Sequence, residues 1–338
     1  MLRAYCTDGP DRLEIGVSGP EQRAEIEEIW RASFPEDSAA ARALFLDRLL
    51  PSGYCLSGSV GGRPVTMAFL LPAELETGAA ALPLQYIFAA ATLPACRGRG
   101  LFGRLLRQAL KRARKQGIAA SFLRPAEPGL AAYYERFGYR PFFRTAADRA
   151  GREIFHPEET PPTGRFALLE DERNVAAFRN AALEGYPVWV RWPDELAALA
   201  ADAAGLSGGG AFAGEGGFAL CEPAGDMLFI RDWSCRPAAE KELRAAVAAH
   251  FPQREIALSR PAAPGEGEFF GWLCPLNGER DFWASLEKKS PYLGLAFEEP
   301  GVFQPGGRFP AILFFRQVRR LDGRKDAEDD CCIFSDGF

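Results

Sequence analysis

The sequence contains little histidine. Only His156 and His250 occur among its 338 residues, and they lie far apart. Zinc sites usually combine several His, Cys or acidic ligands at short spacings, so we expect no metal cofactor. The eight cysteines show no C-x-x-C pair and no regular spacing. A disulfide framework, which is typical of short secreted chains, is therefore excluded.

Long apolar runs are also missing. The chain has no run of about 18 apolar residues, which excludes a membrane-spanning helix. The first residues, MLRAYCTDGPDRLE, are polar, so no signal peptide is expected. Together with the cysteine pattern, these absences favour a cytoplasmic protein with no membrane partner.

The composition is that of an ordinary globular chain, with 47% apolar and 25% charged residues. Its length suits two domains better than one. The net charge of −5 argues against a dedicated nucleic-acid-binding protein, so we expect no nucleic-acid partner. Small anionic ligands remain compatible with this charge, because charge can be segregated locally.

Acidic residues are absent from one long stretch. Between Thr77 and Ala126 there is no Asp or Glu, although nine Lys or Arg occur there. Within it, residues 98–103 read Gly-Arg-Gly-Leu-Phe-Gly, or G-x-G-x-x-G. Glycines before a helix let backbone N–H groups approach a ligand, and the helix N-terminus adds unpaired donors and the positive end of its dipole. The stretch therefore predicts a phosphate site. The lysines and arginines further along the helix, within residues 111–115, are expected mostly to form a solvent-exposed basic face.

The two standard nucleotide motifs do not fit this stretch. A dinucleotide site needs an acidic residue about 20 residues beyond the glycines, to hold the ribose. The corresponding region, Ile118 to Leu123, contains no acid, and the first one downstream is Glu127. The phosphate-loop pattern G-x-x-x-x-G-K-[ST] is absent from the chain.

Hydrophobic periodicity predicts alternating helices and strands over the first 155 residues. The expected helices cover residues 21–33, 39–50, 101–116 and 130–137, and the expected strands cover residues 53–60, 64–72, 84–92, 118–123 and 139–145. The strand at 84–92 is apolar on both faces, which indicates a central position in a sheet. The first domain is therefore predicted to be α/β or α+β.

The second part of the chain repeats this order in outline. A Pro-rich linker is predicted at residues 156–164, a second domain at 165–320 and a tail at 321–338. In the second domain, a hairpin at 211–221 and a strand at 226–233 precede a helix that begins at Pro237. Further strands are expected at 255–259 and 311–318.

The glycine stretch at residues 98–103, together with the strand before it, resembles a known family motif. Residues 86–106, YIFAAATLPACRGRGLFGRLL, resemble the coenzyme A motif of the GNAT acetyltransferase superfamily, [QR]-x-x-G-x-[GA] after a central strand. Arg97 and Gly100 match it, whereas Phe102 stands where Gly or Ala is usual. Residues 132–139, AYYERFGY, resemble the superfamily's FYEKLGF element. The resemblance covers residues 13–144 and implies a GNAT acyl-CoA acyltransferase fold, with a mixed central sheet flanked by helices.

The resemblance also implies an acyl donor, acetyl-CoA, and the residues that bind it. The backbone of the central strand would pair with the pantetheine arm like an added strand. Backbone N–H groups of the loop would bind the pyrophosphate, and an arginine such as Arg104 could reach a phosphate. The implied donor-binding residues are Ala90, Ala91, Thr92, Arg97, Gly98, Arg99, Gly100, Leu101, Phe102, Gly103 and Arg104.

Tyr134 matches the family's general acid. A phenol with a pKa near 10 can donate a proton to the departing thiolate as the tetrahedral intermediate collapses. A packed aromatic residue with a satisfied hydroxyl is the alternative interpretation. The base that deprotonates the acceptor is left open among Glu36, Asp37, Glu74 and Glu76, each of which could equally be a surface acid.

The two-domain arrangement resembles tandem acetyltransferases of the enhanced intracellular survival type. The second domain of those proteins lacks the cofactor loop, and here the equivalent stretch, Ser234 to Lys241, has no glycine and carries a proline. The resemblance thus implies a degenerate GNAT-like second domain that forms one wall of the acceptor cleft. It also raises the hypothesis that the C-terminal carboxylate of Phe338 acts as the base.

The predicted function is transfer of an acetyl group from acetyl-CoA to a primary amine, by direct attack of the amine. The acceptor, a small molecule or a peptide, is left open among aminoglycosides, polyamines, peptide N-termini and lysine, and so is homo-oligomerisation. One alternative is a non-catalytic protein that binds or senses acyl-CoA. Another is RNA or protein binding through the basic helix, against which the overall acidity speaks.

Overall fold

The structure is a computed structural model. It describes residues 13–77, 80–126, 128–155, 164–170, 174–184, 186, 188–253, 255–261, 268–278, 280, 282–283, 295–297 and 303–305. Contacts divide these residues into two compact units. The first unit contains residues 13–71 and 87–112, and the second contains residues 72–86 and those from 113 onwards that are described. Strands β3 (Arg63–Glu76) and β4 (Ala81–Thr92) run from one unit into the other.

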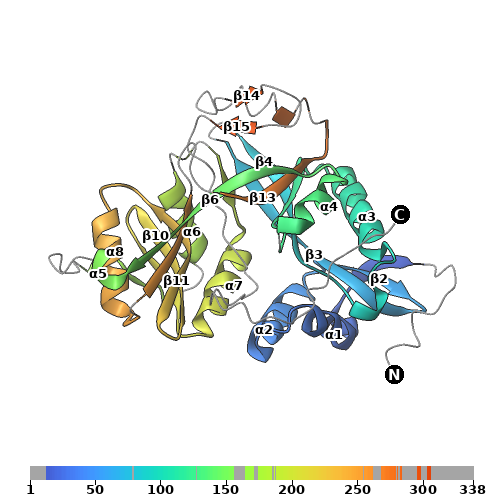
Figure 1. Cartoon of the computed structure of the whole chain (residues 1–338), viewed down its shortest axis with the longest axis horizontal. Helices are drawn as coiled ribbons and strands as arrows, with labels where there is room; N and C mark the ends of the chain where they lie inside the picture. Colours follow the sequence, from blue (N-terminus) through green and yellow to red (C-terminus); the bar gives the residue numbers. More distant parts are fainter. Residues whose placement is uncertain are drawn as a thin grey trace. The chain divides into compact units, whose positions relative to one another are not determined.

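The remaining elements follow in chain order (Figure 1). The helices are α1 (Arg23–Ser33), α2 (Ala39–Leu49), α3 (Leu101–Lys115), α4 (Ala131–Glu135), α5 (Arg152–Phe155), α6 (Val175–Leu183), α7 (Asp194–Gly205) and α8 (Glu240–His250). The strands are β1 (Glu14–Ser18), β2 (Cys55–Val60), β5 (Ala120–Leu123), β6 (Arg140–Gly151), β7 (Ala167–Leu168), β8 (Trp189–Arg191), β9 (Gly210–Gly214), β10 (Gly217–Ala224), β11 (Met227–Cys235), β12 (Glu255–Pro261), β13 (Glu268–Pro275), β14 (Leu295–Phe297) and β15 (Phe303–Pro305).

The first unit is an antiparallel arrangement of β1, β2 and β3 with a core centred on Trp30 of α1. The Trp30 ring lies 5.8 Å from that of Phe45 on α2 and 5.6 Å from that of Phe69 on β3. Its ring is also 5.7 Å from that of Phe88 on β4, so one indole joins two helices to two strands. The Ser38 hydroxyl accepts the Ala41 N–H at 3.1 Å and thereby caps α2.

Helix α3 connects β4 to its neighbour β5. At the end of the helix the chain is back beside the start of β4, because the Ala119 N–H donates to the Pro83 carbonyl at 2.8 Å. Only two residues of β4 precede Pro83. The paired strand β5 must therefore run in the same direction as β4, as expected for a β-α-β crossover.

The sheet of the second unit combines strands from distant parts of the chain. Its order is β4-β5-β13-β6-β12-β11-β10-β9-β7, and β8 pairs with β3. Strand β13, from the second half of the chain (residues 165–338), lies antiparallel between β5 and β6. Strand β6 pairs with β12 on its other side. Strands of the first and second halves therefore alternate in one sheet.

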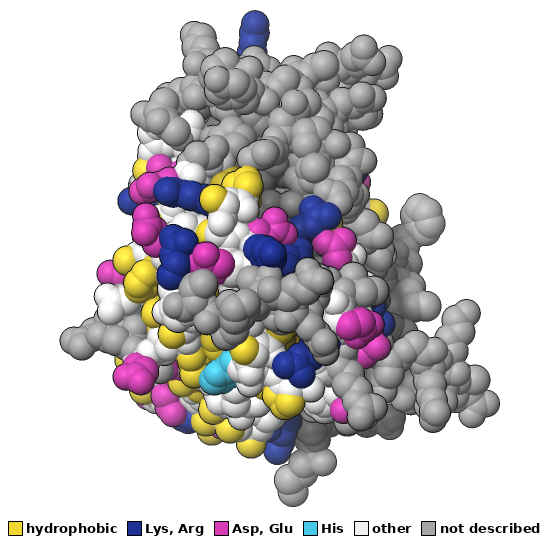
Figure 2. Space-filling view, turned by 90° about the vertical axis from the view of Figure 1, so that its left-hand side faces the viewer, with side chains coloured by type: hydrophobic (Ala, Val, Ile, Leu, Met, Phe, Trp, Pro, Cys, Tyr) yellow, Lys and Arg dark blue, Asp and Glu magenta, His cyan; other side chains and the backbone are white. Residues whose placement is uncertain are grey.

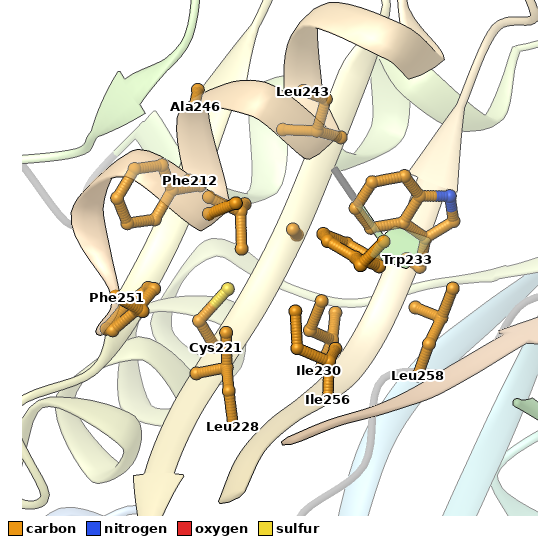
Figure 3. Close-up of a cluster of buried hydrophobic side chains, with 14 of the residues drawn as sticks. Phe212, Cys221, Leu228, Ile230, Trp233, Leu243, Ala246, Phe251, Ile256 and Leu258 are labelled. Carbon is orange, nitrogen blue, oxygen red and sulfur yellow. The ribbon is translucent and has the colours of Figure 1, made fainter. Parts of the chain in front are cut away.

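Strands β9 to β12 carry their own core. Helix α8 lies on one face of β10 and β11, and α6 and α7 lie on the other (Figure 1). Leu243 of α8 packs in a buried cluster with Ile230 of β11 and Ile256 of β12 (Figure 3). The cluster also contains Val247 of α8. Burial of each such side chain contributes about 1.5–3 kcal/mol. Strands β11 and β12 are parallel, and in the chain they precede and follow α8. Strands β4 and β5 precede and follow α3 in the same way.

A buried ion pair holds the opposite face of these strands. Arg179 of α6 and Asp232 of β11 are both buried, and Nε of Arg179 lies 2.6 Å from Oδ2 of Asp232. The same guanidinium donates to the Val190 carbonyl at 2.8 Å. This pair thus ties α6 to β11 and β8. At the surface, the described basic and acidic side chains on the face that Figure 2 views are interspersed.

The predicted helices and strands of the first 155 residues are confirmed, with boundaries shifted by a few residues. Helix α8 begins at Glu240 rather than at Pro237, because residues 237–239 form a turn in which the Ala239 N–H donates to the Arg236 carbonyl at 2.9 Å. The predicted strand at 311–318 and the tail lie outside the described residues, as does nearly all of the linker. The predicted domain boundaries stay a prediction.

Candidate active site

The end of β4 has an unusual backbone. Ala89 has a φ of 48°, and it is the only non-glycine residue with positive φ in the described part of the chain. Such a conformation costs about 1–3 kcal/mol and persists only where the surrounding structure enforces it. Residues of this kind cluster at functional sites. Here the distortion immediately precedes the three residues that were predicted to bind the pantetheine arm, Ala90, Ala91 and Thr92.

Strand β4 is also longer than its neighbour β5. Strand β5 starts beside Pro83 and has only four residues, whereas β4 continues to Thr92. The last residues of β4 therefore extend past the end of β5. An extended ligand could pair with this backbone like an added strand.

The opposite edge of the same segment is held by β3. The Thr66 hydroxyl donates to the Ala91 carbonyl at 3.0 Å and lies 2.8 Å from the Thr92 hydroxyl. The Leu93 N–H donates to the Val65 carbonyl at 2.9 Å. Thr66 and Thr92 are both buried. These bonds keep the end of β4 rigid.

The glycine loop leads from β4 into α3. Gly98 and Gly100 have φ values of 75° and 67°, which other residues rarely adopt, and a Cβ atom on either would meet nothing within 4 Å. The Arg104 N–H donates to the Gly100 carbonyl at 3.2 Å, so the helix begins directly after Gly100. The first N–H groups of α3, starting at Leu101, have no partner within the helix. The loop and helix end can therefore receive an anion.

The arginines of this loop have different surroundings. Nε of Arg97 donates to the Thr92 carbonyl at 3.1 Å, and its Nη2 donates to the Ser33 hydroxyl at 3.4 Å. Arg97 thus ties the loop to β4 and α1. Arg104, on α3, is exposed, and Arg99 is half-buried. Arg97 therefore shapes the loop, whereas the part of Arg104 in binding a phosphate stays a prediction.

The residue that departs from the family pattern lies in the first turn of α3. Phe102 is half-buried, and Gly103, which follows it, is buried. The left-handed positions are Gly98 and Gly100 and not residue 102. Phe102 therefore does not occupy a position that requires glycine.

Tyr134, on α4 in the second unit, is buried among aromatic rings. Its ring lies 5.4 Å from the Tyr133 ring and 6.0 Å from the Tyr139 ring, both edge-on. Burial, reinforced by the phenols of Tyr133 and Tyr86, raises the pKa of Tyr134 above its usual value. Burial also raises the pKa of Tyr86 to about 12, a shift that Arg124 partly opposes. Tyr134 therefore keeps its proton at neutral pH and can act as an acid.

The four candidate bases fall into two groups. Oδ2 of Asp37 accepts the Trp30 indole N–H at 2.7 Å, and Glu76 forms an ion pair with Arg191 at 2.6 Å. Glu36 and Glu74 are exposed. Asp37 and Glu76 thus have structural roles, which makes them weaker candidates than the exposed pair. Phe338 lies outside the described residues.

Sequence reasoning missed that β13 lies beside β5 and contacts the segment between α3 and β5. Nδ2 of Asn277, just beyond this strand, donates to the Ile118 carbonyl at 3.1 Å, and Nε of Arg114 donates to the Leu276 carbonyl at 3.1 Å. The apolar run FFGWLCP at residues 269–275 signals a buried strand. Its pairing partners could not be read from that run.

A family model for an acetyltransferase (GNAT) domain matches residues 18–142. These residues are a GNAT acetyltransferase domain. The match includes both the glycine loop and Tyr134. A search of curated proteins found no match.

Solved structures resemble the chain over a longer span than the GNAT domain. A protein of unknown function from Enterococcus faecalis is 15% identical, with 78% of this chain and 73% of that chain covered and a TM-score of 0.63. A GCN5-related N-acetyltransferase from Kribbella flavida is 19% identical, with 78% and 70% covered and a TM-score of 0.60. Eis1 from Mycobacterium abscessus is also 19% identical, with 78% and 74% covered and a TM-score of 0.60. The fold likeness therefore extends beyond the GNAT domain into the second half.

Two further features bear on the site. Within the described ranges, no three His, Cys, Asp or Glu side chains gather into a metal-binding group. Among the same residues, no helix is both long enough and apolar enough to cross a membrane.

Proposed function

We propose that this GNAT acetyltransferase transfers the acetyl group of acetyl-CoA to a primary amine of a small molecule or a peptide. The distorted end of β4, followed by a left-handed glycine loop at the start of α3, carries the proposal. In one short stretch it provides an edge for an extended arm and a set of N–H groups for a pyrophosphate. No acid lies between Thr77 and Ala126 to repel these phosphates.

The proposed reaction needs no covalent enzyme intermediate. The amine nitrogen attacks the thioester carbonyl carbon, and the tetrahedral intermediate collapses with cleavage of the C–S bond. Tyr134, which is protonated at neutral pH as a phenol, donates its proton to the departing thiolate. The proton lost by the amine goes to a base, for which Glu36, Glu74 and the carboxylate of Phe338 are the candidates.

The function is tested with purified protein, acetyl-CoA and a panel of primary amines. Loss of the thioester absorbance, which the protein's own cysteines do not disturb, should accompany an equal amount of N-acetylated amine in the mass spectrum. Binding of acetyl-CoA without loss of the thioester, across the panel, would instead favour an acyl-CoA-binding protein. Thioester loss without an acetylated amine would reject the amine as acceptor.

The loop is tested by Gly100→Ala. A Cβ atom at this left-handed position costs about 1–2 kcal/mol of backbone strain, although it meets no neighbour. Because relief of that strain moves the N–H groups, we expect coenzyme A to bind about tenfold more weakly. Gly61→Ala is the matched control, since Gly61 has a φ of 58° and equally open space in the β2–β3 turn. Both variants should lose similar thermal stability, and calorimetric titration should show weaker binding in Gly100→Ala alone.

The hypothesis for Phe338 is tested by removing this residue. Deletion moves the terminal carboxylate to Gly337, so turnover should fall far more than acetyl-CoA binding. Phe338→Leu keeps a carboxylate at the same position and should retain most activity. Equal turnover in the deleted and intact chains, measured at saturating acetyl-CoA, would show that the Phe338 carboxylate is not the base.

A further inference from the structure

A buried hydrogen bond lies next to the proposed general acid. Ser121 of β5 and Tyr139, just before β6, are both fully buried, and their hydroxyl oxygens are 2.8 Å apart. A buried hydroxyl without a partner is costly, and Ser121 supplies the partner.

Tyr139 is connected to Tyr134 in two ways. The Tyr139 N–H donates to the Tyr134 carbonyl at 3.4 Å, and the Phe137 N–H donates to the same carbonyl at 2.9 Å. The two tyrosine rings meet edge-on at 6.0 Å. The turn between them is tight, with Gly138 at a φ of 91°. A shift of the Tyr139 ring would therefore be passed directly to Tyr134.

Strand β13, from the second half of the chain, packs against the Ser121–Tyr139 pair and the turn after α4. Cys274 is the direct partner of Ser121 in the β5–β13 register. Its Sγ lies 3.5 Å from the Phe137 carbonyl, and a Cβ atom on Gly138 would lie 3.3 Å from that sulfur. Cys274 is buried and packs against the turn that follows α4. The Leu276 N–H, which donates to the Ala119 carbonyl at 2.9 Å, holds the end of β13 in place.

We propose that Tyr139 is a positioning residue for Tyr134, held in place by Ser121 and enclosed by Cys274 of β13. This inference rests on the proposed function. A general acid must lie within about 2.6–3.2 Å of the atom that it protonates. A displacement of about 1 Å can lower turnover by about a hundredfold. The hydroxyl pair fixes the ring on which Tyr134 packs.

The test is a double-mutant cycle of Tyr139→Phe and Ser121→Ala. Either single change leaves one buried hydroxyl without its partner, whereas the double variant removes both. We expect each single variant to lower kcat about tenfold, with the KM for acetyl-CoA within about twofold, and the double variant to lose less than the product of the two. The alkaline limb of the pH profile should move in the single variants, because the surroundings of Tyr134 change.

The matched control is a second buried hydroxyl pair, Ser18 and Ser57, in the first unit. The two oxygens are 2.7 Å apart, and both residues are buried. Ser18→Ala and Ser57→Ala should lower thermal stability as much as the Tyr139 and Ser121 changes do, but leave kcat unchanged. If the variants of both pairs lose stability and none loses turnover, Tyr139 is merely structural and the proposal is overturned.

Hydrogen exchange supplies a readout that does not depend on acyl transfer. Amides of residues 131–139 should exchange faster in Tyr139→Phe and Ser121→Ala, and not in the serine control variants. A wild-type protein that transfers no acetyl group would refute the proposed function, while exchange at 131–139 would still decide whether Tyr139 holds α4. Unchanged exchange in both single variants would overturn the inference.

The role of β13 is tested separately by Cys274→Ala against Cys221→Ala. Both thiols are buried and free, but Cys221 lies in the core beneath α8. We expect faster exchange at 131–139 and lower kcat in Cys274→Ala alone. Equal effects of the two variants on these readouts would remove Cys274 from the proposal.

Discussion

Tyr134→Phe is expected to lower kcat by at least about a hundredfold, the lower range of what a positioned general acid contributes. The change deletes only the hydroxyl, so the edge-on ring contacts with Tyr133 and Tyr139 are retained. Binding of coenzyme A and thermal stability should therefore stay close to those of the wild type. Single-turnover kinetics at saturating acetyl-CoA would separate loss of chemistry from loss of binding.

Tyr133→Phe is the control for this prediction. Tyr133 lies on the same helix and is half-buried, and its ring packs against Tyr134 and under the Arg136 guanidinium. Loss of its hydroxyl should leave kcat within about twofold of the wild-type value, as expected for a group outside the chemistry. A Tyr134→Phe enzyme as active as Tyr133→Phe would show that Tyr134 is a packed aromatic residue.

The pH dependence follows from the raised pKa of Tyr134. Because the folded protein holds this proton more tightly than the unfolded chain does, the group contributes stability below the unfolded pKa of about 10. That contribution is lost as the pH rises towards the folded pKa. We therefore expect that deprotonation of Tyr134 does not lower kcat up to about pH 10. The fall of kcat at higher pH should be absent in Tyr134→Phe.

A chain that ends after Gly164 is expected not to fold into an active GNAT domain, although it contains the whole segment matched by the family model. Strand β6 is paired with β12 on one side and β13 on the other, and β5 is paired with β13. Both partner strands would be missing. Unpaired buried backbone groups and exposed apolar faces would remain. Near-ultraviolet circular dichroism and thermal unfolding should show no cooperative transition.

The control is the full chain carrying a specific protease site within residues 157–163. After cleavage both pieces are present, and the pairings of β6 with β12 and β13 do not require the peptide link. The cleaved protein should therefore keep most of its acetyl-transfer activity and unfold cooperatively. Cooperative folding and activity of residues 1–164 alone would show that the two halves are independent domains.

These two predictions draw on different kinds of information. The glycine loop and the aromatic element are short and local, so their resemblance to the GNAT motifs was enough to single out Arg97, Gly100 and Tyr134. Their partners could not be found in this way. Spacing does not show that the Arg97 side chain binds the Thr92 carbonyl and Ser33, or that Asp37 is engaged by Trp30. Each of these bonds depends on how a side chain packs after the chain has folded.

The sequence by itself determined the helices and strands of the GNAT domain, because apolar periodicity, caps and glycines act over a few residues. It also determined that a glycine loop precedes α3. Only the tertiary structure decided that β13 lies between β5 and β6, since strand pairing joins residues more than a hundred positions apart and leaves no local pattern. The same pairing puts Cys274 beside Ser121, which is hydrogen-bonded to Tyr139. The burial that raises the pKa of Tyr134 is likewise a property of the folded chain.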